Sequence, residues 1–125
     1  MDFAHAITDA AAKFESGDLA GAADTFKRLC EDETIGAGRR AIAAFNLAVT
    51  YDKMGHVDHA VAAHEYGASV VTTDYAFAQE NRAAYLHKIG RVDDAIAIWR
   101  HLLDLEFLPQ NRIDALRHNL AVAGG

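Results

Sequence analysis

The chain has 125 residues and a formal net charge of −6 at pH 7, with no block of basic residues. Binding to a phosphate backbone needs clustered lysine and arginine, so the composition argues against a nucleic-acid partner. No apolar run is long enough to span a membrane, and the acidic start of the chain lacks the basic region of a secretory signal. We therefore expect a cytoplasmic protein. The single proline and the absence of strand-like alternation predict an all-α fold.

The first third of the chain predicts two helices and a loop. Apolar residues at helical spacing favour helices over 3–15 and 19–31, separated by Gly17. Residues 31–38 contain two glycines and begin with acids, so we expect an exposed loop there. Cys30 is the only cysteine, which excludes an internal disulfide, and we expect it to be a small buried residue of the second helix.

The same spacing predicts five more helices in the remaining chain. Asp58, Asp74 and Asp93 stand near three of their starts, where a side-chain oxygen can cap the free N–H groups. Pro109 cannot continue a helix and should end the sixth. The expected helices cover residues 39–54, 58–71, 75–89, 93–106 and 110–122.

A short string, Gly-x-(Leu/Val)-x-x-Ala, occurs three times, beginning at Gly17, Gly55 and Gly90. The spacings of 38 and then 35 residues indicate a repeat architecture in which each turn joins two helices. A stacked array must also cover its last apolar face, and a final solitary helix would do so. The predicted hairpins are about 3–31, 39–71 and 75–106, with a capping helix at about 110–122.

These repeats resemble the tetratricopeptide repeat (TPR) family. In that family a small residue precedes the turn glycine by seven positions, an alanine follows it by five, and an aromatic residue by nine. The matching positions here are Ala10, Ala48 and Ala83, then Ala22, Ala60 and Ala95, then Phe26, His64 and Trp99. The resemblance covers residues 3–122 and implies an α-solenoid of three TPR-like hairpins plus a C-terminal capping helix, in a single domain over 1–125.

The chain departs from the family pattern at several positions. The apolar site eight residues before the glycine holds Asp9 in the first copy and Arg82 in the third. The aromatic residue four before the glycine is kept only as Tyr51. The first spacing also exceeds the family's 34 residues, and the surplus falls in the 31–38 loop.

The resemblance implies a concave groove lined by the first helix of each hairpin. The lining positions lie thirteen, ten, six and three residues before each turn glycine. The same periodic spacing, continued along the chain, gives the lining positions of the last helix. The expected peptide-binding residues are Ile7, Ala11, Phe14, Phe45, Asn46, Val49, Asp52, Phe77, Glu80, Asn81, Ala84, His87, Asp114 and His118. Phe14, Phe45 and Phe77 would offer apolar surface for a partner to cover, but a small helix rotation would instead turn them inward.

The implied function is a non-enzymatic protein-interaction module, a scaffold or adaptor without a cofactor. It would clasp an amphipathic helix or an extended peptide by apolar anchors. Asp52, Glu80 and Asp114 would attract a basic end of that ligand.

Family members that clamp a terminal carboxylate carry lysine, arginine and asparagine in this groove. Here only Asn46 matches, and the other positions hold Ile7, Ala11, Phe77 and Asn81. Without a cation a bound carboxylate would be left unpaired, so we do not expect a free acidic C-terminus as the ligand.

Two other readings remain open. The chain could homo-oligomerise through its last helix, next to the apolar cluster of Leu105, Phe107 and Leu108. His56 and His59 could hold a metal ion with Asp58, although no third ligand stands at a fixed spacing. His64 occupies a family aromatic position and is expected to be a half-buried filler.

Overall fold

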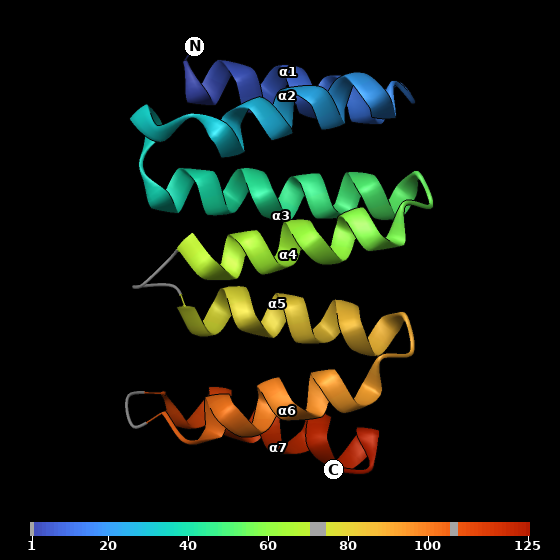
Figure 1. The fold of residues 1–125 in the computed structure, drawn as a ribbon. Helices are drawn as coiled ribbons and strands as arrows, with labels where there is room; N and C mark the ends of the chain where they lie inside the picture. Colours follow the sequence, from blue (N-terminus) through green and yellow to red (C-terminus); the bar gives the residue numbers. More distant parts are fainter. Residues whose placement is uncertain (1, 71–74, 106–107) are drawn as a thin grey trace. The chain divides into compact units, whose positions relative to one another are not determined.

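The computed structural model describes residues 2–70, 75–105 and 108–125, and within these ranges it contains seven α-helices, one 3-10 helix and no strand (Figure 1). None of the helices in this part of the chain has the length and apolar character needed to cross a membrane. The elements are α1 Phe3–Glu15, α2 Leu19–Glu31, η1 Glu33–Ile35, α3 Ala37–Lys53, α4 Val57–Val70, α5 Tyr75–Lys88, α6 Val92–Leu103 and α7 Gln110–Ala123.

The predicted helices are confirmed, with shifted ends. The first two have the predicted bounds. The predicted loop over 31–38 is shorter than expected, because η1 forms inside it and α3 already begins at Ala37. The sixth helix ends at Leu103, ahead of the predicted residue 106, which lies outside the described residues.

Two of the predicted N-caps are wrong. α4 and α6 each begin at a valine one residue before the aspartate, so Asp58 and Asp93 lie inside the first turn. A carboxylate there still interacts favourably with the positive end of the helix dipole. Asp74 lies outside the described residues. A side-chain cap exists at α2, where Asp18 Oδ1 accepts a hydrogen bond of 3.0 Å from the N–H of Gly21.

The three repeat turns have the same backbone geometry. Gly17, Gly55 and Gly90 have φ angles of 91°, 79° and 89°, in the left-handed region where glycine is favoured. The N–H of each glycine donates a hydrogen bond to the carbonyl oxygen three residues earlier. The N–H of the next residue donates to the carbonyl oxygen five residues earlier, and the N–O distances are 2.8–3.1 Å. This hydrogen-bond pair is the glycine helix stop that links two antiparallel helices, and it explains why the string repeats.

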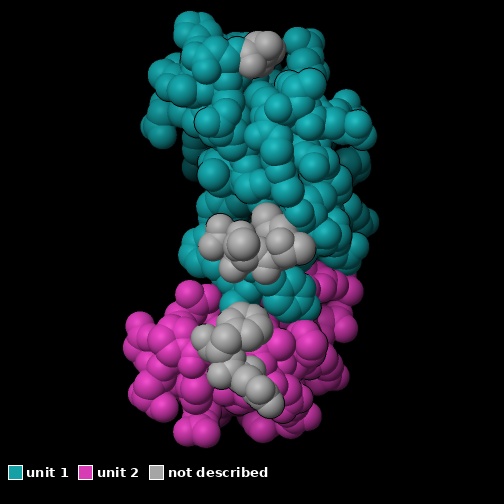
Figure 2. Space-filling model, turned by 90° about the vertical axis from the view of Figure 1, so that its left-hand side faces the viewer, with its two compact units in different colours: residues 1–78 teal, residues 79–125 magenta. Residues whose placement is uncertain are grey.

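The chain divides into two compact units, residues 1–78 and 79–125 (Figure 2), and each is described by itself. The first unit holds α1 to α4 and the start of α5, and its core consists mainly of alanines with a few large side chains. Its small repeat positions have no exposed surface: Ala10, Ala22, Ala48 and Ala60. The prediction that these residues allow close helix crossing is therefore supported by complete burial.

The second unit contains most of α5, all of α6 and α7, and a core with larger side chains. Its repeat alanines, Ala83 and Ala95, are also fully buried. Trp99, at the family aromatic position, is 4% exposed, and Leu102 on α6 and Leu116 on α7 are buried, while α6 packs against α7. The prediction that the whole chain is a single domain stays a prediction.

Cys30 is a buried side chain of α2, as predicted, and its Sγ lies 3.9 Å from the carbonyl oxygen of Arg40. Burial, aided by the negative charge of Glu31, raises the pKa of this thiol to about 11. The folded state therefore disfavours the thiolate.

This raised pKa predicts a pH-dependent stability. The pKa of this thiol is higher in the folded state than its unfolded value near 9. Its contribution to the free energy of unfolding is therefore fully present below pH 9 and is lost as the pH rises towards 11. Between about pH 8 and pH 10 we expect a loss of about 1–1.5 kcal/mol in unfolding free energy that Cys30→Ala lacks. Urea denaturation of both proteins at the two pH values measures this loss. An equal change in unfolding free energy for the parent and for Cys30→Ala would contradict the prediction.

Candidate functional site

A stripe of exposed apolar side chains runs along α3. Ile42, Phe45 and Val49 are 51%, 42% and 40% exposed. Their spacing of three and four residues places them on one face of the helix. We call these three residues the α3 stripe. Large side chains on the opposite face of the same helix, such as Leu47, are buried.

A cavity of about 210 Å³, here called the groove cavity, adjoins this stripe in the first unit. Four of its lining residues are predicted site residues, and they come from α1 and α3: Ala11, Phe14, Asn46 and Val49. The fold thus brings four predicted site residues together at one cavity of seven lining residues, and their role in peptide binding stays a prediction. Glu15, Phe26 and Thr50 complete the lining, and these were missed because they are ordinary core or neighbouring positions in the repeat register.

The three predicted groove phenylalanines behave differently. Phe45 and Phe77 are 42% and 58% exposed, so the alternative that they turn inward is wrong for both. Phe14 is half-buried and packs, together with Ile7, against the core of the first unit. Phe14 can present only one edge to a ligand, because its other side is held by the protein.

A buried histidine lies beneath the α3 stripe. His64 is 8% exposed, so it is buried more deeply than the predicted half-buried filler. Its ring meets the ring of Phe45 edge-on, with centroids 6.1 Å apart. This contact orients Phe45 from below while its outer side stays open to solvent.

The acidic side chains of the predicted groove are not all available to a ligand. Glu80 is half-buried and forms a two-bond ion pair with Arg112, with distances of 3.0 Å and 2.5 Å. Asp114 accepts a hydrogen bond of 2.9 Å from Gln110. Because Arg112 already neutralises Glu80, we expect this acid to contribute little to attracting a basic end of a partner, and that attraction stays a prediction. Sequence spacing gave no sign of this pair, whose members stand 32 residues apart.

The remaining predicted residues lie at the surface of their own units. Ala84, His87 and His118 are exposed, and Asp52 and Asn81 are half-buried. His87 places its ring 5.7 Å from the ring of Trp99, so it covers the core of the second unit. No lysine or arginine occupies the positions at which carboxylate-binding members of the family carry them.

The alternative of a metal ion held by His56 and His59 with Asp58 was left open by the sequence. His56, His59 and Tyr51 form a group of tilted rings with centroids 5.2–6.3 Å apart, whereas His64 contacts Phe45. Within the described ranges no group of three or more histidine, cysteine or acidic side chains is arranged to hold a metal ion. Of the predicted oligomerisation cluster, Leu105 and Leu108 are half-buried and Phe107 lies outside the described residues.

No family model matches the chain, and no curated protein sequence is significantly similar. Among solved structures, the first TPR of Spaghetti (RPAP3), bound to the HSP90 peptide SRMEEVD, superimposes with a TM-score of 0.66 at 15% sequence identity. The match covers 98% of this chain and 96% of that one. The chain thus has a TPR-like fold, which confirms the predicted all-α helical repeat.

Proposed function

We propose that the chain is a protein-interaction module that binds an apolar segment of a partner along the α3 stripe and into the groove cavity. The observation that carries the proposal is the exposure of Ile42, Phe45 and Val49 on one helix face beside a cavity lined by Phe14 and Phe26. An apolar patch next to a concave site is typical of a peptide-binding surface. The TPR-like fold, which in Spaghetti (RPAP3) binds a peptide, supports the same function.

The chemistry of the site favours a ligand with apolar anchors over a free acidic C-terminus. The first and last stripe residues, Ile42 and Val49, are seven residue steps apart on α3, about 10 Å, which matches two turns of a partner helix. The groove cavity is lined by one acid, Glu15, and by no lysine or arginine. A carboxylate placed there would lose its hydration without gaining a partner.

A display screen of helical and extended peptides, followed by affinity measurements, tests the proposal. Phe45→Ala combined with Val49→Ala should weaken binding of the selected peptides at least about tenfold, because truncation of buried anchors at interface centres costs more than 1 kcal/mol. Val122→Ala, at a 66% exposed position of α7, is the matched control and should leave binding unchanged. If the double variant keeps the parent's affinities, the α3 stripe is not the binding surface.

The peptide SRMEEVD provides a direct comparison with the solved TPR structure. We expect it to bind at least about tenfold more weakly than the selected apolar peptides, because no cation lines the groove cavity. Tighter binding of SRMEEVD would contradict the ligand class while leaving the interaction role intact. Self-association through α7 is the competing role, and light scattering that shows a monomer at about 100 μM would exclude it.

A further inference from the structure

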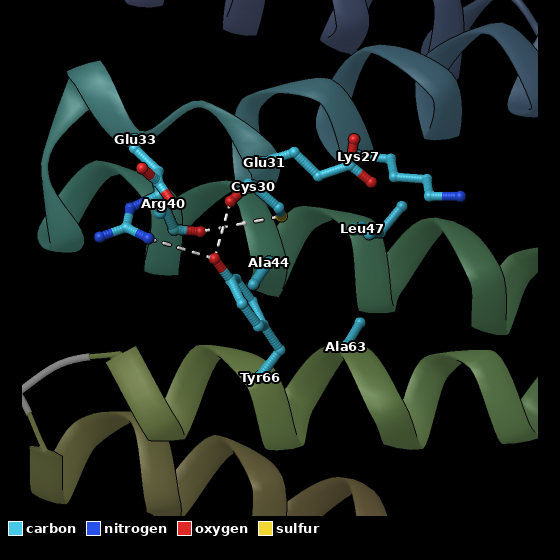
Figure 3. Close-up of a pocket in the computed structure, with 9 residues that line it drawn as sticks. All are labelled: Lys27, Cys30, Glu31, Glu33, Arg40, Ala44, Leu47, Ala63 and Tyr66. Carbon is cyan, nitrogen blue, oxygen red and sulfur yellow. Dashed lines mark hydrogen bonds between the residues drawn. The ribbon is translucent and has the colours of Figure 1, made fainter.

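A larger cavity, of about 440 Å³, is lined by α2, η1, α3 and α4 of the first unit (Figure 3). On α3 it is lined by Arg40, Ala44 and Leu47, whereas the groove cavity uses Asn46 and Val49. Because these two sets point to different sides of one helix, the two cavities are separate. We call this larger one the α2–α4 cavity.

Five of the nine residues that line the α2–α4 cavity are uncharged, and the other four are charged: Cys30, Ala44, Leu47, Ala63 and Tyr66, then Lys27, Glu31, Glu33 and Arg40. Ala44 and Ala63 leave space where larger residues would fill it, and Leu47 covers one end. Tyr66 rises from α4, donates a hydrogen bond of 2.7 Å to the carbonyl oxygen of Cys30, and so presents a fixed ring face. The size and lining are those of a small-molecule site.

Arg40 is an incompletely compensated cation at one end of this cavity. It is half-buried, and its Nη1 donates a long hydrogen bond of 3.4 Å to the Tyr66 hydroxyl. Its Nε is buried without a hydrogen-bond partner, and no ion pair is formed by Arg40 among the residues that the structure describes. A half-buried guanidinium whose Nε has lost hydration without gaining a partner favours the arrival of an anion.

The longer first repeat explains the position of Arg40. The surplus residues form η1 and the early start of α3, which place Arg40 in the first turn of α3. Glu31 and Glu33 also line the cavity, but both are exposed, so solvent and salt screen their repulsion of an anion. Lys27, at the opposite end from Arg40 in Figure 3, adds a second exposed cation.

We propose that the α2–α4 cavity binds a small carboxylic acid with an unbranched apolar chain. The carboxylate pairs with the Arg40 guanidinium, and the chain lies over Ala44 towards Leu47 and Ala63. Arg40 and Leu47 are seven residue steps apart on α3, about 10 Å, which suits a medium-length alkyl chain. This site is separate from the peptide surface, and its existence does not depend on the proposed function.

Titration with octanoate, followed by NMR signals of Ala44, Ala63 and Tyr66, tests the proposal in the intact chain. We expect saturable shifts at these residues, and at least about tenfold weaker binding of octanamide, which has the same shape without the charge. Octylamine should also bind more weakly than octanoate. No shift at about 10 mM octanoate, or equal binding of the amide, would overturn the proposal.

Matched variants test the two ends of the site. Arg40→Gln should weaken octanoate binding at least about tenfold, and Arg39→Gln, at the exposed neighbouring residue, should not. Ala63→Leu should fill the cavity and abolish binding, whereas Ala62→Leu on the exposed side of α4 should have no effect. Glu33→Gln should tighten binding slightly.

Thermal unfolding of each variant checks that the fold is retained. If Lys27→Gln abolishes binding and Arg40→Gln does not, the assigned orientation is wrong. The octanamide comparison needs no variant, so it remains decisive even if one of the substituted proteins does not fold.

Discussion

Replacement of Trp99 by alanine is expected to lower the free energy of unfolding by about 3–5 kcal/mol, the range seen when a large buried aromatic side chain is truncated. Trp99 is 4% exposed on α6 and contacts the ring of His87 on α5. Its removal would leave a void in the core of the second unit that the close-packed surroundings cannot fill without moving. The loss is a large share of the stability of a small domain.

Urea denaturation followed by circular dichroism measures this loss, because the variant lacks the only tryptophan and its fluorescence. Trp99→Phe is the matched control, since it keeps an aromatic ring and should lose clearly less stability. Val122→Ala, at an exposed position, should change stability by less than about 0.5 kcal/mol. A Trp99→Ala protein within about 1 kcal/mol of the parent would show that this residue does not hold the second unit together.

The features predicted well from sequence are those set by local geometry. Gly17, Gly55 and Gly90 could be identified because a helix stop of this kind needs a left-handed residue. The burial of the repeat alanines followed from the same register, since a close helix crossing excludes larger side chains. Helix ends shifted by one to three residues because apolar residues such as Val57 and Val92 extend a helix past a potential cap.

The features that sequence did not reveal depend on contacts between distant residues. The pair of Glu80 and Arg112 joins α5 to α7, and no spacing rule predicts which arginine neutralises which acid. The repeat register placed Phe45 on the exposed groove face, where the structure has it, but it could not show that Phe14 packs against the core. The α2–α4 cavity is lined in part by Glu33 and Arg40, which lie within and just after the irregular insertion, for which the repeat pattern offers no template.

The role of Gly67 also depends on a contact with a distant residue. From sequence alone, a glycine inside a helix only indicates a less stable helix. Gly67 lies within α4 and costs about 1 kcal/mol of helix propensity relative to alanine. A β-carbon built at Gly67 would lie 3.2 Å from the β-carbon of Ala44 on α3. The missing side chain therefore permits the close packing of α3 and α4, and Ala44 on the facing helix has no exposed surface.

Gly67→Leu should consequently lower the free energy of unfolding by about 1–3 kcal/mol, despite the better helix propensity of leucine, because its side chain must displace Ala44 or separate the helices. Ala44→Gly removes the methyl group that clashes. In a double-mutant cycle by urea denaturation, the two changes together should be at least about 1 kcal/mol less harmful than their sum. Ala62→Leu, at an exposed position of α4, controls for the added leucine and should be nearly neutral. Additive effects would mean that Gly67 is tolerated for a reason other than its approach to Ala44, and the tight packing of α3 on α4 would then rest on the buried alanines alone.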